Sequence, residues 1–224
     1  MAVANNADHR IVLRKLSTIS TASPLRYGRA VTTPRPKGTR LLIGFSPKLQ
    51  RRVTLHNRRA FEQWLLLESD PSVEAFCERP VMIKTSHGVK LADFWVRAGT
   101  REAFLVMDEP ALQDCVEIGV DILAIRHVDA AELAASRQWT QNWEHMLPVI
   151  NANIGSIPSS LATDVRRFID APRPLMQIER HFAIGDPSVV RACVFELLRI
   201  GYLAAPSLRT EALTLTTSFM RTTQ

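Results

Sequence analysis

The feature that most limits the fold is a series of short apolar runs around one amphipathic helix within residues 39–155. From Arg58 to Glu68 the apolar side chains recur at helical spacing. Val81–Thr85 and Val89–Val96 flank His87-Gly88, which predicts a β-hairpin. Strands on both sides of a helix predict an α/β unit, in which a mixed sheet carries helices on its faces.

The other elements of this unit are predicted from shorter patterns. Apolar runs between turn residues indicate strands, and longer periodic runs indicate helices. We expect further strands at Leu41–Phe45, Arg52–Leu55, Val73–Cys77, Ala103–Met107 and Asp121–Arg126, a short helix at Leu112–Ile118, and one or two helices across Ala130–Asn153, bent near Pro148.

Residues 156–224 have a different character. Three helical patterns, Ser160–Asp170, Leu175–Ala183 and Pro187–Ile200, precede two strand-like runs, Tyr202-Leu203 and Leu213–Phe219. Three helices followed by two short strands predict a small winged-helix-like domain. An alternative stays open, namely that these helices complete the first domain.

The basic residues are concentrated at one end of the chain. Residues 1–52 contain 11 Lys or Arg against one acid, whereas the remaining 172 residues contain 17 against 21 acids. Residues 1–38 mix Ser, Thr, Pro, Arg and Gly without a period, so we expect an extended basic arm. Such an arm suits contact with phosphates, and a solvated tail is the alternative.

The cysteine content indicates a reducing compartment. The three cysteines, Cys77, Cys115 and Cys193, lie far apart, and no CxxC pair occurs. Free thiols are the expected state, and no zinc site is predicted. The sequence contains no apolar stretch typical of a signal peptide or a membrane span. We therefore expect a soluble intracellular protein without a membrane partner.

Several short motifs follow one another in a fixed order. They are Ser46-Pro47-Lys48 with Arg51-Arg52-Val53, then Arg59-Ala60-Phe61-Glu62, Glu78-Arg79-Pro80, Ala92-Asp93-Phe94-Trp95-Val96, and Phe104 to Glu109. This order resembles the TnsA family, the endonuclease subunit of heteromeric transposases, over residues 40–224. The resemblance implies a restriction-endonuclease-like fold, and residues 186–219 resemble the family's small C-terminal domain.

The resemblance implies a site for Mg²⁺-dependent cleavage of DNA. Carboxylates hold the metal beside the scissile phosphate, and a lysine supports the attacking water. Glu62 matches the family's helix acid and Asp93 its hairpin acid, so both are the expected metal ligands. Asp108 and Lys84 are further catalytic candidates, because a shifted register would let Asp108 bind the metal and Lys84 is near in sequence.

The sequence departs from the family where catalysis needs an acid or Gln, and then a lysine two residues later. Met107 and Glu109 occupy those positions, and a thioether is a poor Mg²⁺ ligand. We therefore expect a weakened or inactive nuclease, with a non-catalytic DNA-binding adaptor as the alternative. The resemblance implies duplex DNA at transposon ends, a DDE-type transposase and an AAA+ regulator as partners, in a bacterial cytoplasm. The expected DNA-binding residues are Arg35, Lys37, Arg40, Lys48, Arg51 and Arg52.

Overall fold

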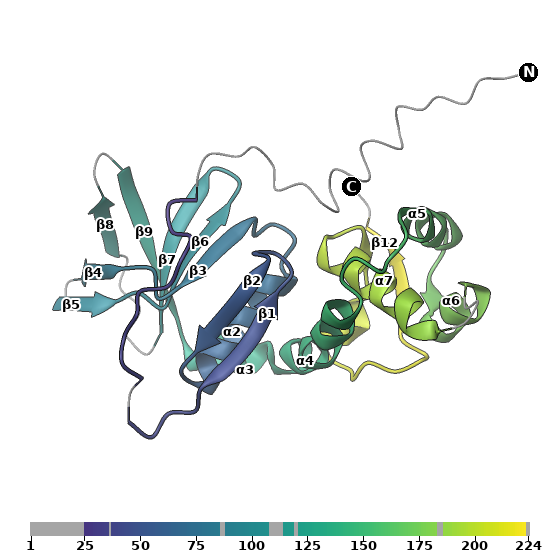
Figure 1. Cartoon of the computed structure of the whole chain (residues 1–224), viewed down its shortest axis with the longest axis horizontal. Helices are drawn as coiled ribbons and strands as arrows, with labels where there is room; N and C mark the ends of the chain where they lie inside the picture. Colours follow the sequence, from purple (N-terminus) through teal and green to yellow (C-terminus); the bar gives the residue numbers. More distant parts are fainter. Residues whose placement is uncertain are drawn as a thin grey trace, which may run out of the picture.

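Figure 1 shows the chain as a computed structural model. The described residues are 25–35, 37–85, 88–107, 114–118, 121–182 and 186–222, with the backbone alone described at 85, 114–118, 121 and 122. The first 24 residues of the predicted arm lie outside them, as do the catalytic candidate Asp108 and its neighbour Glu109.

A five-stranded mixed sheet forms the centre of the first half of the chain. Its strands are β3 (Ala75–Glu78), β6 (Phe94–Ala98), β7 (Arg101–Met107), β8 (Asp114–Ile118) and β9 (Asp121–Val128). They lie in the order β3, β6, β7, β9, β8, and all neighbours are antiparallel except β7 and β9. The predicted α/β class and mixed sheet are therefore confirmed (Figure 1).

The predicted short helix at 112–118 is wrong. The described part of this segment is β8, and all five of its residues pair with β9, from Asp114 opposite Ile125 to Ile118 opposite Asp121. A segment this short gains little from helical hydrogen bonds alone, so a partner strand decides its conformation. β8 becomes an edge of the sheet.

Two hairpins accompany the sheet. They are β1 (Leu42–Ser46) with β2 (Arg51–Leu55), and β4 (Met82–Thr85) with β5 (Gly88–Leu91). The predicted strand Val89–Val96 is divided between β5 and β6, because the chain changes partners. The Ala92 N–H donates to the Val81 carbonyl, whereas the Asp93 N–H donates to the Leu105 carbonyl in β7. Asp93 thus stands where the chain enters the central sheet.

Helices pack against one face of the central sheet. They are α2 (Arg58–Ser69), α3 (Ala130–Ala135) and α4 (Arg137–Ala152). The predicted helical stretch 130–153 breaks at Ser136, and Pro148 lies within α4. The apolar sides of α2 and α4 share a buried core with Phe94 and Leu105 of the sheet. None of the described helices is long and apolar enough to span a membrane.

The opposite face of the sheet is covered differently from the prediction. Among the described residues no helix contributes to its core, and residues 25–35, here called the strap, pack there with the β4–β5 hairpin. The ring of Tyr27 lies 5.7 Å from the rings of Trp95 and Phe104, measured between centroids. The Val31 N–H donates to the Arg79 carbonyl over 2.8 Å. Part of the predicted arm is therefore built into the fold.

After α4 the chain alternates helices with very short strands. They are α5 (Ser159–Phe168), β10 (Arg173–Pro174), α6 (Leu175–Phe182), α7 (Pro187–Arg199), β11 (Leu203–Ala204), a 3₁₀ turn (Pro206–Arg209) and β12 (Ser218–Arg221). Strand β12 lies between β10 and β11 and is antiparallel to both. The three predicted helices are present. The second predicted strand is displaced, because β12 begins at Ser218 and pairs with β11 through Met220 and Arg221.

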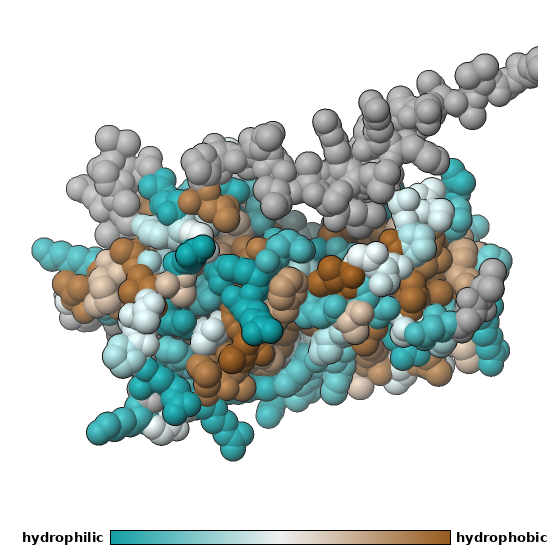
Figure 2. All heavy atoms as spheres, viewed as in Figure 1, coloured by the Kyte–Doolittle hydropathy of each residue, from teal (hydrophilic) through white to brown (hydrophobic). Residues whose placement is uncertain are grey.

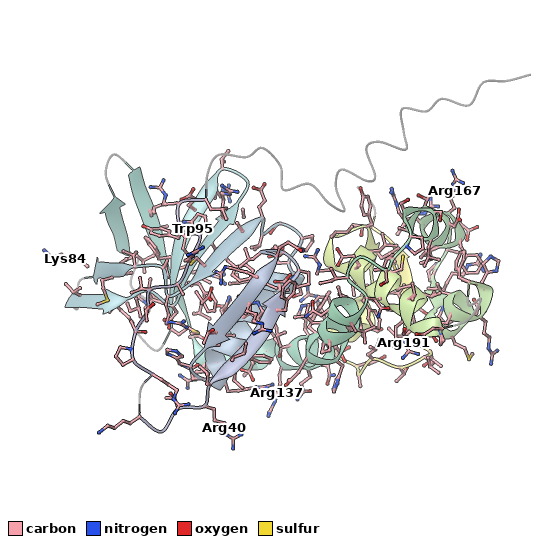
Figure 3. All side chains as sticks on the ribbon, in the orientation of Figure 1. Arg40, Lys84, Trp95, Arg137, Arg167 and Arg191 are labelled. Carbon is pink, nitrogen blue, oxygen red and sulfur yellow. The ribbon has the colours of Figure 1, made fainter. Side chains whose placement is uncertain are left out.

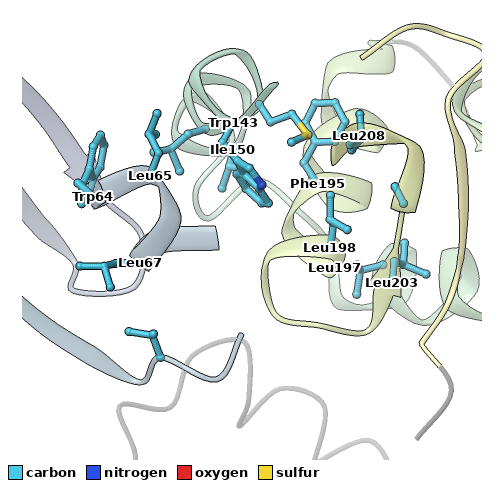
Figure 4. Close-up of a cluster of buried hydrophobic side chains, with 14 of the residues drawn as sticks. Trp64, Leu65, Leu67, Trp143, Ile150, Phe195, Leu197, Leu198, Leu203 and Leu208 are labelled. Carbon is cyan, nitrogen blue, oxygen red and sulfur yellow. The ribbon is translucent and has the colours of Figure 1, made fainter. Parts of the chain in front are cut away.

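One buried core runs from α2 through α4 to α7 (Figure 4). It contains Trp64 of α2, Trp143 of α4 and Phe195 of α7, each at most 2% exposed. These side chains belong to one cluster, so the core contains described residues from both sides of the predicted domain boundary between 155 and 156.

The two cysteines whose side chains are described, Cys77 and Cys193, are free and buried. Burial raises the pKa of Cys77 to about 11 and that of Cys193 to about 12. Both thiols are therefore protonated at neutral pH, which suits packing and gives little nucleophilicity.

Candidate functional site

Asp93, the predicted hairpin acid, is held firmly at the junction of β5 and β6. Its Oδ2 accepts a hydrogen bond of 2.7 Å from the backbone N–H of Met107, at the end of β7. Its own carbonyl accepts from the Arg79 N–H over 2.9 Å. The structure therefore brings together two positions of the family pattern, the hairpin acid and the end of the next strand.

The side chain of Met107 belongs to the core beneath α2. It is 4% exposed and lies in the same cluster as Leu105, whereas Phe104 and Val106 belong to the core on the other face. This is the alternation expected of a strand, whose side chains point to opposite faces in turn. Met107 contributes packing at this position, and its thioether offers no hard oxygen to a divalent cation.

A cleft of about 290 Å³ opens beside Asp93. We call it the Asp93 cleft, and its polar wall consists of Asp93, Glu78, Arg79, His56 and Asn57. The strap and the first turn of α2 contribute to the rest of the wall, together with apolar residues of β2, β5 and β6 and the β5–β6 junction. A wider hollow of about 760 Å³ lies between the end of α2, the sheet and the C-terminal helices. Its wall contains none of the predicted site residues that the structure describes, so the Asp93 cleft is the candidate site.

Glu78 is a cleft residue that the sequence pattern did not single out. Its side chain is buried, and Arg51 donates two hydrogen bonds to it, of 2.8 and 2.6 Å. Burial alone would lower the pKa of Arg51, but the hydrogen bond and the charge of Glu78 raise it overall. Arg51, a predicted DNA-binding residue, is thus committed to an internal ion pair.

Two predicted catalytic residues lie apart from the Asp93 cleft. Glu62 accepts a hydrogen bond of 2.9 Å from Arg58 and is absent from the described wall of the cleft. Ala60 does line the cleft, and two helical positions correspond to about 200° around the axis, so Glu62 points away. Lys84 is exposed on β4, and Figure 3 shows it at the outer edge of the molecule.

The described residues do not fit Mg²⁺ at this site. Within the described part of the chain, no group of three His, Cys, Asp or Glu side chains is placed to hold a metal ion. Of the two acids in the cleft, Glu78 is neutralised by Arg51, and Asp93 already accepts from the Met107 N–H. Mg²⁺ therefore has no complete set of ligands among the described residues, and the predicted role of Asp108 lies outside them.

The predicted DNA-binding residues fall into two groups. Arg35, Lys37, Arg40 and Arg52 are exposed. Figure 3 shows Arg40 projecting below β1, and Figure 2 shows hydrophilic side chains along this lower edge of the molecule. Lys48, like Arg51, forms interactions inside the protein. Its Nζ donates to the carbonyls of Leu67 and Asp70, both at 2.7 Å, at the end of α2.

The charge of Lys48 also interacts with Glu68 and with the C-terminal end of α2. Its backbone N–H donates to Oε1 of Glu68 over 2.9 Å, and its ammonium group stands at the C-terminal end of α2, where the helix dipole favours a cation. Burial lowers the pKa of Lys48 to about 8 despite the nearby negative charge of Glu68. A lysine in this position supports the helix end, and its partners lie about twenty residues away in the sequence, where no local pattern predicts them.

No known family model matches the sequence, and no curated protein is similar to it.

Proposed function

We propose that the chain is a DNA-binding subunit of the TnsA type, which holds duplex DNA at transposon ends and cuts it weakly or not at all. The observation that carries the proposal is a set of exposed cations that have no carboxylate partner among the described residues. We call them the arm cations, and they are Arg29, Arg35, Lys37, Arg40 and Arg52. DNA phosphates bind cations of this kind and release counterions in return.

The surrounding sequence makes the arm cations unusual. Residues 25–52 contain eight Lys or Arg and no acid. Three of the eight have internal partners: Arg26 pairs with Glu102, Arg51 with Glu78, and Lys48 with the end of α2. Like charges left together repel one another, so a polyanion is the partner that would stabilise the other five.

The first prediction concerns the salt dependence of DNA binding. Replacing Arg35, Lys37 and Arg40 by Gln should flatten the slope of log Kobs against log salt by about 2.7, because each lost phosphate contact contributes about 0.9. Fluorescence anisotropy with a labelled duplex, between about 50 and 200 mM salt, measures this slope. Deleting residues 1–38 is a poorer test, because it also removes Tyr27 from the sheet.

The matched control removes three exposed cations elsewhere. Arg101, Arg167 and Arg180 are exposed and lie outside the arm, so their replacement by Gln changes the net charge equally. This control should leave the slope nearly unchanged. Equal slopes for the two triple variants would show that net charge, and not the arm, determines binding, and the proposal would fail.

The second prediction concerns cleavage. The wild-type chain should nick DNA weakly or not at all with Mg²⁺ or Mn²⁺, even beside its partners, because a buried Met107 offers no oxygen ligand. Met107→Gln with Glu109→Lys restores the family's residues, and Gln is close to Met in size, so the core need not bury a charge. This double change should leave metal-dependent nicking low, because Glu62 points away from the cleft and the described acids do not complete a metal site. Robust wild-type cleavage that Asp93→Ala abolishes would contradict the proposal.

The arrangement of the C-terminal helices supports the proposal of a winged-helix-like domain, as do their order with the strands and the central position of β12. We propose that this domain has a structural role and does not read DNA. The third helix of such a domain reads DNA by entering the major groove. Here that helix is α7, which packs against α4, α5 and α6, with Val190 and Val194 buried. We therefore propose that the arm, and not α7, contacts DNA.

A further inference from the structure

Arg79 has a strained backbone beside the Asp93 cleft. Its φ is 45°, in the left-handed region that residues with a side chain rarely adopt, and the following Pro80 disfavours helical conformations further. Two hydrogen bonds fix this conformation, because the Arg79 N–H donates to the Asp93 carbonyl and the Arg79 carbonyl accepts from Val31. Strain of this kind persists where the surroundings enforce it, often at ligand-binding sites.

The guanidinium of Arg79 is only partly satisfied within the fold. Its Nη1 donates to the Thr54 carbonyl, and its Nε, enclosed by the surrounding atoms, has no acceptor among the described residues. Burial lowers the pKa of Arg79, but a guanidinium stays charged in a protein. A half-buried cation that lines a cleft favours an anion as the ligand.

The positive charge of Arg35 also reaches the same cleft. His56 lines it, and burial first, then the charges of Arg79 and Arg35, lower the pKa of His56. The strap that carries Arg35 also forms part of the wall, through Thr33 and Pro34. The first turn of α2, which carries no acid, adds its positive dipole end to this potential.

The two acids of the cleft are partly neutralised. Glu78 accepts two hydrogen bonds from Arg51, and Asp93 accepts one from the Met107 N–H. Three guanidinium groups, those of Arg35, Arg51 and Arg79, therefore stand against two carboxylates. The excess charge in and around the cleft is therefore positive, and it favours the neutral form of His56.

We propose that the Asp93 cleft binds a phosphate group, with Arg79 as its main cation and His56 and Arg35 beside it. The inference rests on the proposed DNA-binding function and makes this phosphate one diester of the duplex that the arm holds. A cleft of about 290 Å³ admits a phosphate group and not the width of a duplex, so the DNA lies across its mouth. Free phosphate has the same chemistry, and the experiment separates the two sources.

The binding test uses Arg79→Gln in the full chain, with Arg101→Gln as the control for one lost cation. Arg79→Gln should weaken duplex binding roughly 10-fold, the effect of one hydrogen bond to a charged group, and should flatten the salt slope by about 0.9. Asp93→Asn should tighten binding roughly 2- to 5-fold, because it removes a negative charge and keeps an acceptor for Met107. The cleft site is wrong if Arg79→Gln and Arg101→Gln weaken duplex binding equally and Asp93→Asn does not tighten it. Wild-type chain that binds no duplex overturns the proposed function itself.

A second measurement does not depend on how Arg79→Gln folds. The imidazole of His56 is followed by NMR in the wild-type chain, and His56→Gln identifies its signal. Inorganic phosphate or duplex in the cleft should raise the pKa of His56, because an anion favours imidazolium. A rise with duplex alone assigns the site to diesters, and a rise with both shows that free phosphate also enters. A pKa that moves with neither overturns the proposal.

Discussion

Replacing Arg199 by Met should lower the free energy of unfolding by about 3–5 kcal/mol, because the change removes this cation from the buried Glu68 and the partly buried Glu196. Glu68 is fully buried and accepts from Arg199 at 3.3 Å and from the Ser46 hydroxyl at 2.5 Å. Glu196, in the same helix as Arg199, accepts two hydrogen bonds from it, each of 2.7 Å. Denaturation in urea or guanidinium chloride measures the loss.

Arg191→Met is the matched control for this change. Arg191 also donates two hydrogen bonds to one glutamate, Glu179, but its side chain is 37% exposed. Its loss should therefore cost about 1 kcal/mol or less. Adding Glu68→Gln to Arg199→Met should recover part of the larger loss, because one of the unpaired charges is then gone. Similar costs for Arg199→Met and Arg191→Met would show that the buried pair contributes nothing special.

The same unfolding curves test whether the chain consists of two independently folding domains. Glu68 lies in α2 and Arg199 in α7, so the pair joins the first unit to the predicted C-terminal domain. Two independent domains would give two transitions and a protease cut near Gly155. The shared core favours a single transition, which Arg199→Met should shift as a whole.

Local signals in the sequence predicted much of the fold. The helix predicted from Arg58 to Glu68 runs to Ser69, one residue further. Asp186 caps α7 by accepting from the Ser188 N–H, with proline at the first helical position, as their order in the sequence predicts. Gly201 follows α7 with φ 80°, which suits glycine. These features depend on neighbours in sequence, whereas β8 depends on β9 and was missed.

The candidate site was predicted only in part, because the direction of a helix side chain depends on tertiary packing. The motif order located Asp93 and Met107, which are joined by a hydrogen bond. It could not give the rotation of α2 about its axis, which turns Glu62 from the cleft. A Cβ on Gly44 would lie 2.3 Å from the Trp64 ring, so this glycine lets α2 pack closely on β1. Contacts between residues this far apart in the sequence cannot be predicted from the local sequence pattern.

Arg51 and Arg52 are adjacent cations for which we expect opposite effects. Successive side chains of a strand point to opposite faces, so Arg51 reaches Glu78 while Arg52 is exposed. Arg51→Met should cost about 3 kcal/mol of stability, since it leaves the buried Glu78 unpaired. Arg52→Gln should change stability by less than about 0.5 kcal/mol and flatten the salt slope of DNA binding by about 0.9.

Sequence composition gives no reason to distinguish these two arginines, so the comparison tests the structure directly. Denaturation curves and salt titrations on both single variants supply the four numbers that are needed. If Arg51→Met left stability unchanged and flattened the salt slope, Arg51 would belong to the DNA interface after all. Glu78 would then be an unneutralised acid beside Asp93. Two free carboxylates at the end of the sheet would favour a metal-binding nuclease site over a phosphate-binding cleft.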